Sequence, residues 1–354
     1  MLRQVASSGA QVRTAVRAAA EAGVEALAAD GRPRAVVVTG MGGSGIAGDV
    51  LAAVAGPGCP VPISTLRSHV LPGWVGAQDL VIAVSCSGTT EETLATAAEA
   101  ARRGCRMLGV GGPEGPLRDV VAHARAPYVP VDSAGQPRAT LWGLSMPLVV
   151  AAGHLGLTRV PEEAYEAAAA VLDEIARRCR PDSDAFVNPG KELALALAGR
   201  LPLIWGTSPL AGVAAYRFTS QLAENAKYAS VSGELPEAGH NQICAFDGVL
   251  GAGGGERDIF ADPPAVDTVH GLRLVLLRDA EEHPAVARRR EATLRLAEDR
   301  GVPVTEIPAT GDSPLERLAA LVGPADYASV YLALAYGIDP TPVAPIEQLK
   351  SMTA

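Results

Sequence analysis

Residues 81–92 constrain the fold of this chain more than any other segment. Residues 81–84 are four aliphatic side chains in the pattern of a buried parallel strand. The loop at 85–90 (SCSGTT) carries four hydroxyls, and a helical run at 93–103 follows it. A strand, a hydroxyl-rich loop and a helix start together suit a phosphate, because the free N–H groups and the dipole of the first helical turn face the anion. The alternative is an ordinary serine N-cap, but a cap needs a single hydroxyl.

A glycine-rich segment at 40–45 (GMGGSG) also lies between an aliphatic run and a predicted helix. Its glycines agree with a dinucleotide-binding fingerprint in number but not in order, and no lysine follows them as in a P-loop. Two interpretations remain open. Either the turn admits a sugar that Ser44 contacts, or the glycines only pack a helix against a strand.

The composition indicates a globular protein without a polyanionic partner. The chain has 354 residues, 48% hydrophobic and 19% charged, which suffices for two domains or one two-lobed body. Its net charge of −9 argues against nucleic acid and anionic membrane surfaces as partners. Residues 1–23 have the pattern of an amphipathic helix and not of a signal peptide, and we find no continuous apolar run of about 18 residues.

The cysteines are scattered and never form a CxxC pair. This usage is typical of a reducing compartment, so we expect a cytoplasmic protein. It argues against a disulfide scaffold and against a structural zinc site. The five positions are Cys59, Cys86, Cys105, Cys179 and Cys244.

Strand and helix patterns alternate along the first half of the chain. Short apolar runs alternating with helices indicate an α/β fold with a parallel sheet covered on both faces. Residues 181–190 (PDSDAFVNPG) are predicted to form a linker. Predicted strands lie at 35–39, 61–66, 81–84, 106–110 and 126–131, and predicted helices at 46–55, 93–103, 141–155 and 160–180.

The second half repeats this plan, with strands predicted at 201–205, 272–277 and 302–307 and a helix at 284–300. Arg278 and Asp279 stand where the first copy has its hydroxyl loop, so we expect one phosphate site per chain. The predicted domains are a first lobe with the phosphate loop at 1–156, a connection at 157–190, a second lobe at 191–330 and a C-terminal segment at 331–354.

Four motifs, in this order, resemble those of the bifunctional phosphoglucose/phosphomannose isomerases of the sugar isomerase (SIS) superfamily. They are GMGGSGIAG at 40–48, SCSGTTEET at 85–93, ENAK at 224–227 followed by HN at 240–241, and the C-terminal stretch at 331–350. The resemblance implies two SIS lobes, each a parallel sheet flanked by helices, with a C-terminal helical tail. It also implies a homodimer whose active site lies where lobes and subunits meet.

The resemblance assigns a role to each motif residue. Glu224 of ENAK is the catalytic base, and His240 of HN, supplied by the neighbouring subunit, opens the sugar ring. Lys350 assists at the ring oxygen, and Arg138, in a PRA segment, stabilises the negative intermediate. The phosphosugar is bound by Gly43, Ser44, Ser85, Ser87 and Thr90.

The chemistry of aldose–ketose isomerisation requires these residue types. One carboxylate moves a proton between C1 and C2 through an enediolate. A guanidinium stabilises the developing oxyanion, and imidazole and amine groups suit ring opening near neutral pH. Neither a metal nor a cofactor is required. We therefore expect a metal-free isomerase that interconverts glucose 6-phosphate or mannose 6-phosphate with fructose 6-phosphate.

Two residues depart from the family pattern. Cys86 stands where an aromatic residue is usual, and Gln242 where an acid usually follows His-Asn. These changes leave a non-catalytic phosphosugar-binding protein, a sensor or regulator, as the alternative function. No helix-turn-helix pattern or basic face supports a transcription factor, and the isomerase half of a glucosamine-phosphate synthase would follow a domain with a cysteine nucleophile. A sensor would have no use for Glu224 as a base.

Overall fold

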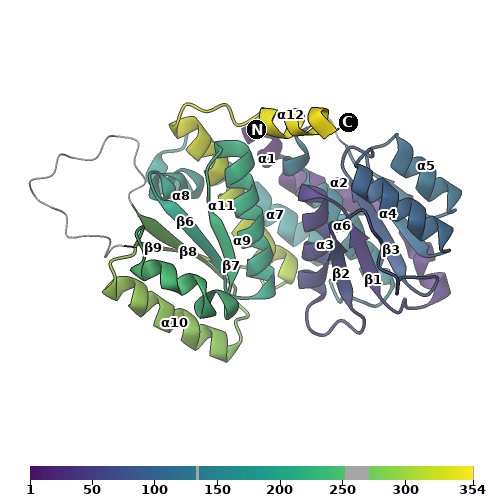
Figure 1. The fold of residues 1–354 in the computed structure, drawn as a ribbon, viewed down its shortest axis with the longest axis horizontal. Coiled ribbons are helices and arrows are strands. Elements are labelled where there is room, and N and C mark those ends of the chain that lie inside the picture. Colours follow the sequence, from purple (N-terminus) through teal and green to yellow (C-terminus); the bar gives the residue numbers. More distant parts are fainter. Residues whose placement is uncertain (133–134, 252–270, 354) are drawn as a thin grey trace, which may run out of the picture. The chain divides into compact units, whose positions relative to one another are not determined.

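The computed structural model describes residues 1–132, 135–251 and 271–353. The chain forms two compact units, each with its own parallel sheet (Figure 1). We call them the N-terminal lobe (Arg3–Asp173 and Asp312–Ala319) and the C-terminal lobe (Met1–Leu2, Glu174–Gly311 and Ala320–Ala354).

The division between the lobes differs from the predicted domain boundaries. It falls inside helix α7 (Glu162–Arg178) and again inside helix α11 (Pro314–Ala335). The predicted linker at 181–190 instead contains the short helix η3 (Ala185–Val187) and the start of α8 (Pro189–Leu197), within the C-terminal lobe. The range predicted for the second lobe includes 252–270, which lie outside the described residues.

The N-terminal sheet has five parallel strands in the order β2-β1-β3-β4-β5. Every residue of β1 and β3 is buried, as expected for strands that helices cover on both faces. The five predicted strands are confirmed, with ends that shift by at most two residues. Their bounds are β1 (Val36–Thr39), β2 (Ile63–Leu66), β3 (Leu80–Ser85), β4 (Arg106–Gly111) and β5 (Tyr128–Pro130).

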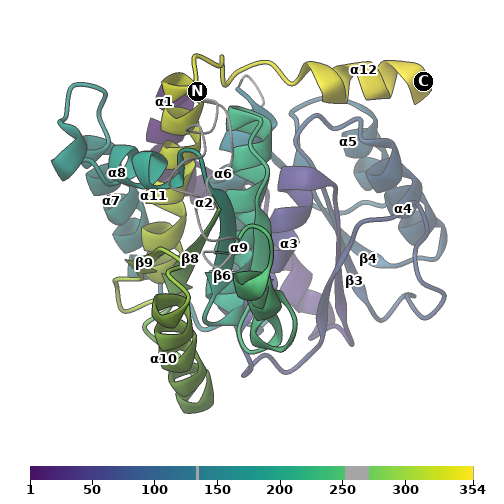
Figure 2. The same ribbon diagram turned by 60° about the vertical axis from the view of Figure 1, so that its left-hand side comes forward.

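Helices cover both faces of this sheet (Figure 2). On one face, α4 (Glu91–Arg102) and α5 (Pro116–His123) share a buried apolar cluster with the strands. On the other lie α3 (Gly42–Ala55), α6 (Leu141–His154) and α2 (Ser8–Glu21), with α6 packed on both α2 and α3.

The helix predicted at 46–55 begins four residues earlier, so the glycine-rich segment forms the first turn of α3. The eight-residue α5 was not predicted, because so short a helix shows little periodicity. The N-terminal lobe also holds all but the first residue of α1 (Leu2–Ala6), together with η1 (Val24–Asp30) and η2 (Pro137–Ala139).

The C-terminal sheet has four parallel strands in the order β7-β6-β8-β9. This order matches β2-β1-β3-β4 of the N-terminal lobe, which confirms that the second half repeats the plan of the first. The bounds are β6 (Leu201–Gly206), β7 (Val231–Glu234), β8 (Leu272–Arg278) and β9 (Val304–Pro308).

The helices of the C-terminal lobe include α9 (Pro209–Gln221), which packs against β6, β7 and β8, and α10 (Pro284–Asp299), which shares a buried cluster with the sheet. Helix α11 (Pro314–Ala335) is long and apolar enough to cross a membrane by length and composition, but 83% of its apolar window is buried inside the protein. It therefore behaves as a core helix. The remaining elements are η4 (Leu222–Ala226), η5 (Glu237–His240), η6 (Gln242–Asp247) and α12 (Ala344–Thr353).

Candidate functional site

The N-terminal sheet has a topological switch point between β1 and β3. Strand β2 pairs with one side of β1, and β3, the next strand in the chain, pairs with the other side. Because β1 and β3 are parallel, their carboxyl ends lie next to each other at the same edge of the sheet. Ligands of open α/β sheets bind in the crevice at such a point. Helices α3 and α4 begin here, and the residues predicted to bind the phosphosugar lie in the first turn of α3 and on the connection from β3 to α4.

The phosphate loop, residues 85–90, connects β3 to α4. Ser85 is fully buried at the end of β3, and its Oγ lies 2.9 Å from Thr90 Oγ1 and 3.5 Å from Ser87 Oγ. Ser87 is exposed, and its Oγ accepts hydrogen bonds from the Thr89 N–H (3.2 Å) and the Thr89 hydroxyl (3.0 Å). Gly88 has a φ of +70°, which only glycine adopts without strain. Thr89 was not among the predicted site residues, although its hydroxyl belongs to the same loop.

The first turns of α3 and α4 carry no side-chain cap. Thr90 is the N-cap residue of α4, but its hydroxyl contacts Ser85 and makes no capping hydrogen bond. Met41, the N-cap residue of α3, also makes none. The Ser44 N–H already donates to the Met41 carbonyl at 3.0 Å. No side chain caps either helix start, which suits an anion at the end of β1 and β3.

The equivalent position in the C-terminal lobe is filled by the protein itself. Because β6 pairs with β8 as β1 pairs with β3, the register puts Asp279 in the place of Ser85. Ser208 caps α9 by accepting from the Ala211 N–H at 3.1 Å, and its hydroxyl donates to Asp279 Oδ2 at 2.7 Å. A buried carboxylate thus lies at the helix start where an anion would bind, which supports one phosphate site per chain.

The glycine-rich segment brings α3 close to both the sheet and the phosphate loop. A Cβ on Gly40 would lie 3.0 Å from Val84 O of β3, and one on Gly48, just beyond the segment, 2.8 Å from Val38 Cβ, so close packing against the sheet accounts for these two glycines. Ser44 is buried, and its Oγ accepts a hydrogen bond from the Cys86 N–H at 3.2 Å. Contact between Ser44 and a sugar stays a prediction, but the residue lies directly against the phosphate loop.

Arg138 lies beside the start of α3. It belongs to the short helix η2, its side chain is buried, and its Nη1 donates to Gln136 Oε1 at 2.9 Å. A Cβ on Gly43 would lie 3.6 Å from Pro137 O, so the first turn of α3 touches the turn that carries the arginine. The structure thus gathers six predicted site residues at one edge of the N-terminal lobe: Gly43, Ser44, Ser85, Ser87, Thr90 and Arg138.

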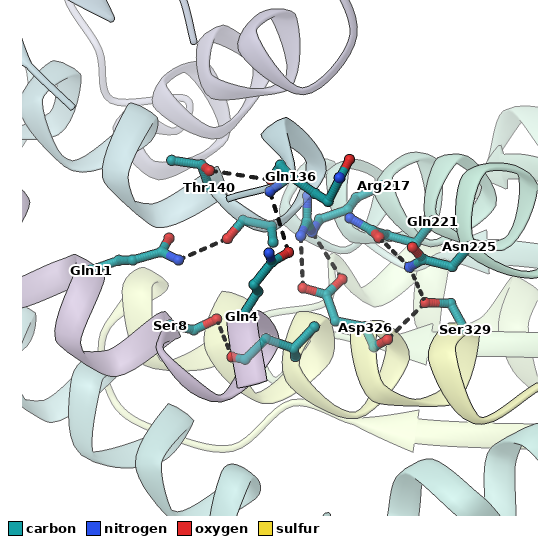
Figure 3. A network of polar contacts seen from close by, with 12 residues as sticks. Gln4, Ser8, Gln11, Gln136, Thr140, Arg217, Gln221, Asn225, Asp326 and Ser329 are labelled. Carbon is teal, nitrogen blue, oxygen red and sulfur yellow. Dashed lines mark hydrogen bonds and ion pairs between the residues drawn. The ribbon is translucent and has the colours of Figure 1, made fainter. Parts of the chain in front are cut away.

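Glu224 lies in the C-terminal lobe, on the π-helical turn η4 that extends α9. Such turns occur frequently at functional sites. A buried polar network fixes this one (Figure 3): Asn225 Nδ2 donates to Gln221 Oε1 at 2.8 Å and to Ser329 Oγ on α11 at 2.9 Å. The Glu224 side chain is half-buried at the rim of this network.

Lys227, the last residue of ENAK, ends the π-turn with a left-handed φ of +55°. Its Nζ donates to the carbonyl of Glu224 at 2.8 Å and to the carbonyl of Pro342 at 2.8 Å. It therefore links the turn to the segment that leads into α12. Sequence reasoning gave Lys227 no role, although the motif itself contained the signal.

His240 and Lys350 lie on other elements of the C-terminal lobe. His240 is exposed at the end of η5, and its Nε2 lies 2.8 Å from Arg289 Nη1 on α10, so the ring nitrogen accepts in this contact. Lys350 is exposed on α12, a helix without buried residues. Convergence of these two side chains and Glu224 on one sugar stays a prediction.

Comparison with known proteins identifies the family. A protein of Caldicellulosiruptor bescii named bifunctional phosphoglucose/phosphomannose isomerase is 32% identical over 322 residues, covering 90% of this chain and 89% of its own. A protein of the same name from Aquifex aeolicus is 32% identical over 328 residues, covering 92% of each chain. The chain belongs to this family.

The C-terminal half and the fold agree with that assignment. A sequence profile of the bacterial phospho-glucose isomerase C-terminal SIS domain matches residues 186–352. Among solved structures, a hypothetical protein from Thermus thermophilus has a TM-score of 0.71 at 16% identity, covering 99% of this chain and 89% of that one. Tagatose-6-phosphate ketose/aldose isomerase from Escherichia coli has a TM-score of 0.66 at 14% identity, covering 96% and 91%. These likenesses confirm the predicted fold of two SIS-type lobes.

Both departures from the family pattern have a structural explanation. Cys86 lies in the phosphate loop with its side chain buried. This burial raises the pKa of the thiol, which disfavours the reactive thiolate. Gln242 accepts from Trp205 Nε1 at 2.7 Å and donates to the carbonyl of Ser232 at 3.0 Å. Its amide thus links β6 and β7 of the C-terminal lobe.

Proposed function

We propose that the chain is a phosphosugar isomerase that interconverts glucose 6-phosphate or mannose 6-phosphate with fructose 6-phosphate, without a metal, through an enediolate. The observation that carries this proposal is the contrast between the lobes. The helices after β1 and β3 start uncapped beside a hydroxyl loop and a buried arginine. The helix after β6 is capped by Ser208 and closed by Asp279.

Each group has a role that its surroundings support. The phosphate binds to the hydroxyls of the phosphate loop and to the first-turn N–H groups of α4. Glu224, on a turn fixed by buried hydrogen bonds, transfers the proton between C1 and C2. Arg138 stabilises the enediolate charge, because a guanidinium stays protonated even when it is buried. His240 and Lys350 open the sugar ring.

A coupled assay of the purified protein with each of the three phosphosugars tests this function. Turnover of glucose 6-phosphate or mannose 6-phosphate to fructose 6-phosphate, unchanged by EDTA, is the expected result. Binding of the phosphosugars without turnover would instead favour the sensor or regulator.

Replacing Ser87 with Ala should raise KM for fructose 6-phosphate about tenfold or more. Hydrogen bonds to a charged group contribute about 1.5–3 kcal/mol each, and 1.4 kcal/mol is a factor of ten. The melting temperature should change little, because Ser87 is exposed. Ser64→Ala, at an exposed serine of β2, is the matched control and should leave KM unchanged. An unaltered KM in Ser87→Ala would place the phosphate elsewhere.

We further propose a homodimer in which His240 serves the active site of the neighbouring subunit. Sedimentation should then give about twice the 36.3 kDa of one chain. Residues 141–156 carry no charged side chain, as suits a subunit interface, but eleven of the 14 residues of α6 are already buried within the chain, so we propose no interface there. The exposure of His240 is compatible with a role in trans.

Subunit complementation tests the trans arrangement directly. Mixed dimers of Glu224→Gln and His240→Ala chains would contain one site with both intact residues only if His240 acts across the interface. We therefore expect activity toward ring-closed sugars to rise when the two impaired variants are unfolded together and refolded. A mixture that stays inactive would assign His240 to its own chain.

A further inference from the structure

The turn that carries Arg138 is held by hydrogen bonds from helices far away in the sequence. Helix η2 has only three residues, so it cannot fix the position of Arg138 by itself. Gln11, on α2, donates from its Nε2 to the carbonyl of Ala139 at 2.8 Å (Figure 3). The same Nε2 lies 3.2 Å from Ser7 Oγ, which keeps the amide in place.

A second glutamine contacts the other end of the turn. Gln4, on α1, accepts a hydrogen bond from the Gln136 N–H at 3.3 Å. The side chain of Gln136 in turn accepts from Arg138 Nη1 at 2.9 Å. The guanidinium of Arg138 is therefore linked through Gln136 to Gln4 on α1.

The opposite side of the turn lies against the phosphate site. Gly43, in the first turn of α3, is close to Pro137 O, and the side chain of Thr140 hydrogen-bonds the Cys86 thiol of the phosphate loop. A displacement of the turn would thus move Arg138 relative to the phosphate loop. The only contact that holds the Ala139 carbonyl from a distant helix among the described residues is the Gln11 amide.

We propose that Gln11 is a positioning residue of the isomerase, which sets the distance of Arg138 from the phosphate loop through the carbonyl of Ala139. This inference rests on the proposed function. The buried Gln11 Oε1 has no partner among the described residues, so the site keeps an amide at a cost in free energy and uses only its N–H group.

The test compares Gln11→Met, which keeps the side-chain length but removes the donor, with wild type. We expect kcat to fall about tenfold, because a misplaced catalytic group loses rate, while KM stays near the wild-type value since the phosphate loop is intact. Gln11→Lys, which restores an N–H donor of similar reach, should recover part of the loss in kcat. An equal kcat in Gln11→Met and wild type would overturn the proposal.

Ser8→Ala is the matched control on the same helix. Ser8 is buried, and its Oγ donates to the carbonyl of Val5 at 2.7 Å, a contact within the helical region that does not reach the turn. This variant should lower the melting temperature at least as much as Gln11→Met but leave kcat unchanged. A fall of kcat in both variants to the same extent would show a general structural effect and overturn the proposal.

The effect must also act through Arg138. Arg138→Ala should itself lower kcat, and adding Gln11→Met to it should lower kcat no further, since residues that act as one unit are not additive. If the two losses in kcat were additive, Gln11 would not act through Arg138; the role of Gln11 would be overturned and that of Arg138 would stand. A wild-type kcat in Arg138→Ala would overturn the proposed role of Arg138, and with it this inference, so the two failures are distinguishable.

Discussion

Glu224→Gln should lower kcat with fructose 6-phosphate by about 10²–10⁴-fold, the usual contribution of a positioned general base. Glutamine has nearly the same shape, so the hydrogen bonds of Asn225 that fix the π-turn should survive. KM should stay close to the wild-type value, because the phosphate loop belongs to the other lobe. Incorporation of solvent deuterium at C2 of the product should vanish with the activity, which steady-state kinetics and NMR measure together.

Two further variants separate the base from other causes of lost activity. Glu192→Gln changes an exposed carboxylate on α8 and should leave kcat unchanged. His240→Ala should slow turnover of ring-closed sugars more than that of open-chain analogues, since only ring opening needs the imidazole. Wild-type turnover in Glu224→Gln would mean that another residue is the base.

Much of the fold was predictable because its signals are local. The apolar runs of β1 and β3 are buried on both faces, so nearly every residue carries the pattern of a parallel strand. The phosphate loop was predictable for a similar reason, since its hydroxyls stand next to each other in the sequence. The repeat was visible because β6 and β8 carry the same kind of apolar run as β1 and β3.

The remaining features depend on contacts that no local pattern reveals. Gln11 and the Ala139 carbonyl are 128 positions apart, and neither residue type indicates a site by itself. The early start of α3 was not predictable because glycines are poor helix formers, and the first turn that they make is placed by its tertiary neighbours, such as the η2 turn beside Gly43. The predicted linker is structured because Asn188 caps α8 by accepting from the Lys191 N–H at 3.0 Å. The sequence could not show this, because the Pro, Asp and Asn residues of 181–190 suit a loop as well as a helix start.

Breaking the buried ion pair between α9 and α11 should cause a large loss of stability. Arg217 donates from Nε and Nη2 to the two carboxylate oxygens of Asp326 at 3.0 and 2.7 Å, with both side chains at most 5% exposed (Figure 3). Asp326→Asn keeps the shape but leaves the guanidinium without its carboxylate. We expect a loss of about 3–5 kcal/mol in the free energy of unfolding, measured with urea and circular dichroism.

The comparison with two other variants shows whether the loss comes from the uncompensated charge. Glu174→Gln breaks an exposed ion pair with Arg177 and should cost less than about 1 kcal/mol. The double variant Arg217→Met with Asp326→Leu removes both charges and should regain much of the stability, because a buried pair stabilises little more than apolar residues of similar size. If the double variant were as unstable as Asp326→Asn, the loss would not come from an uncompensated charge. It would instead show that the hydrogen bonds of the pair are needed to hold α9 against α11. The π-turn that carries Glu224 continues directly from α9, so the same pair would then also support the position of the base.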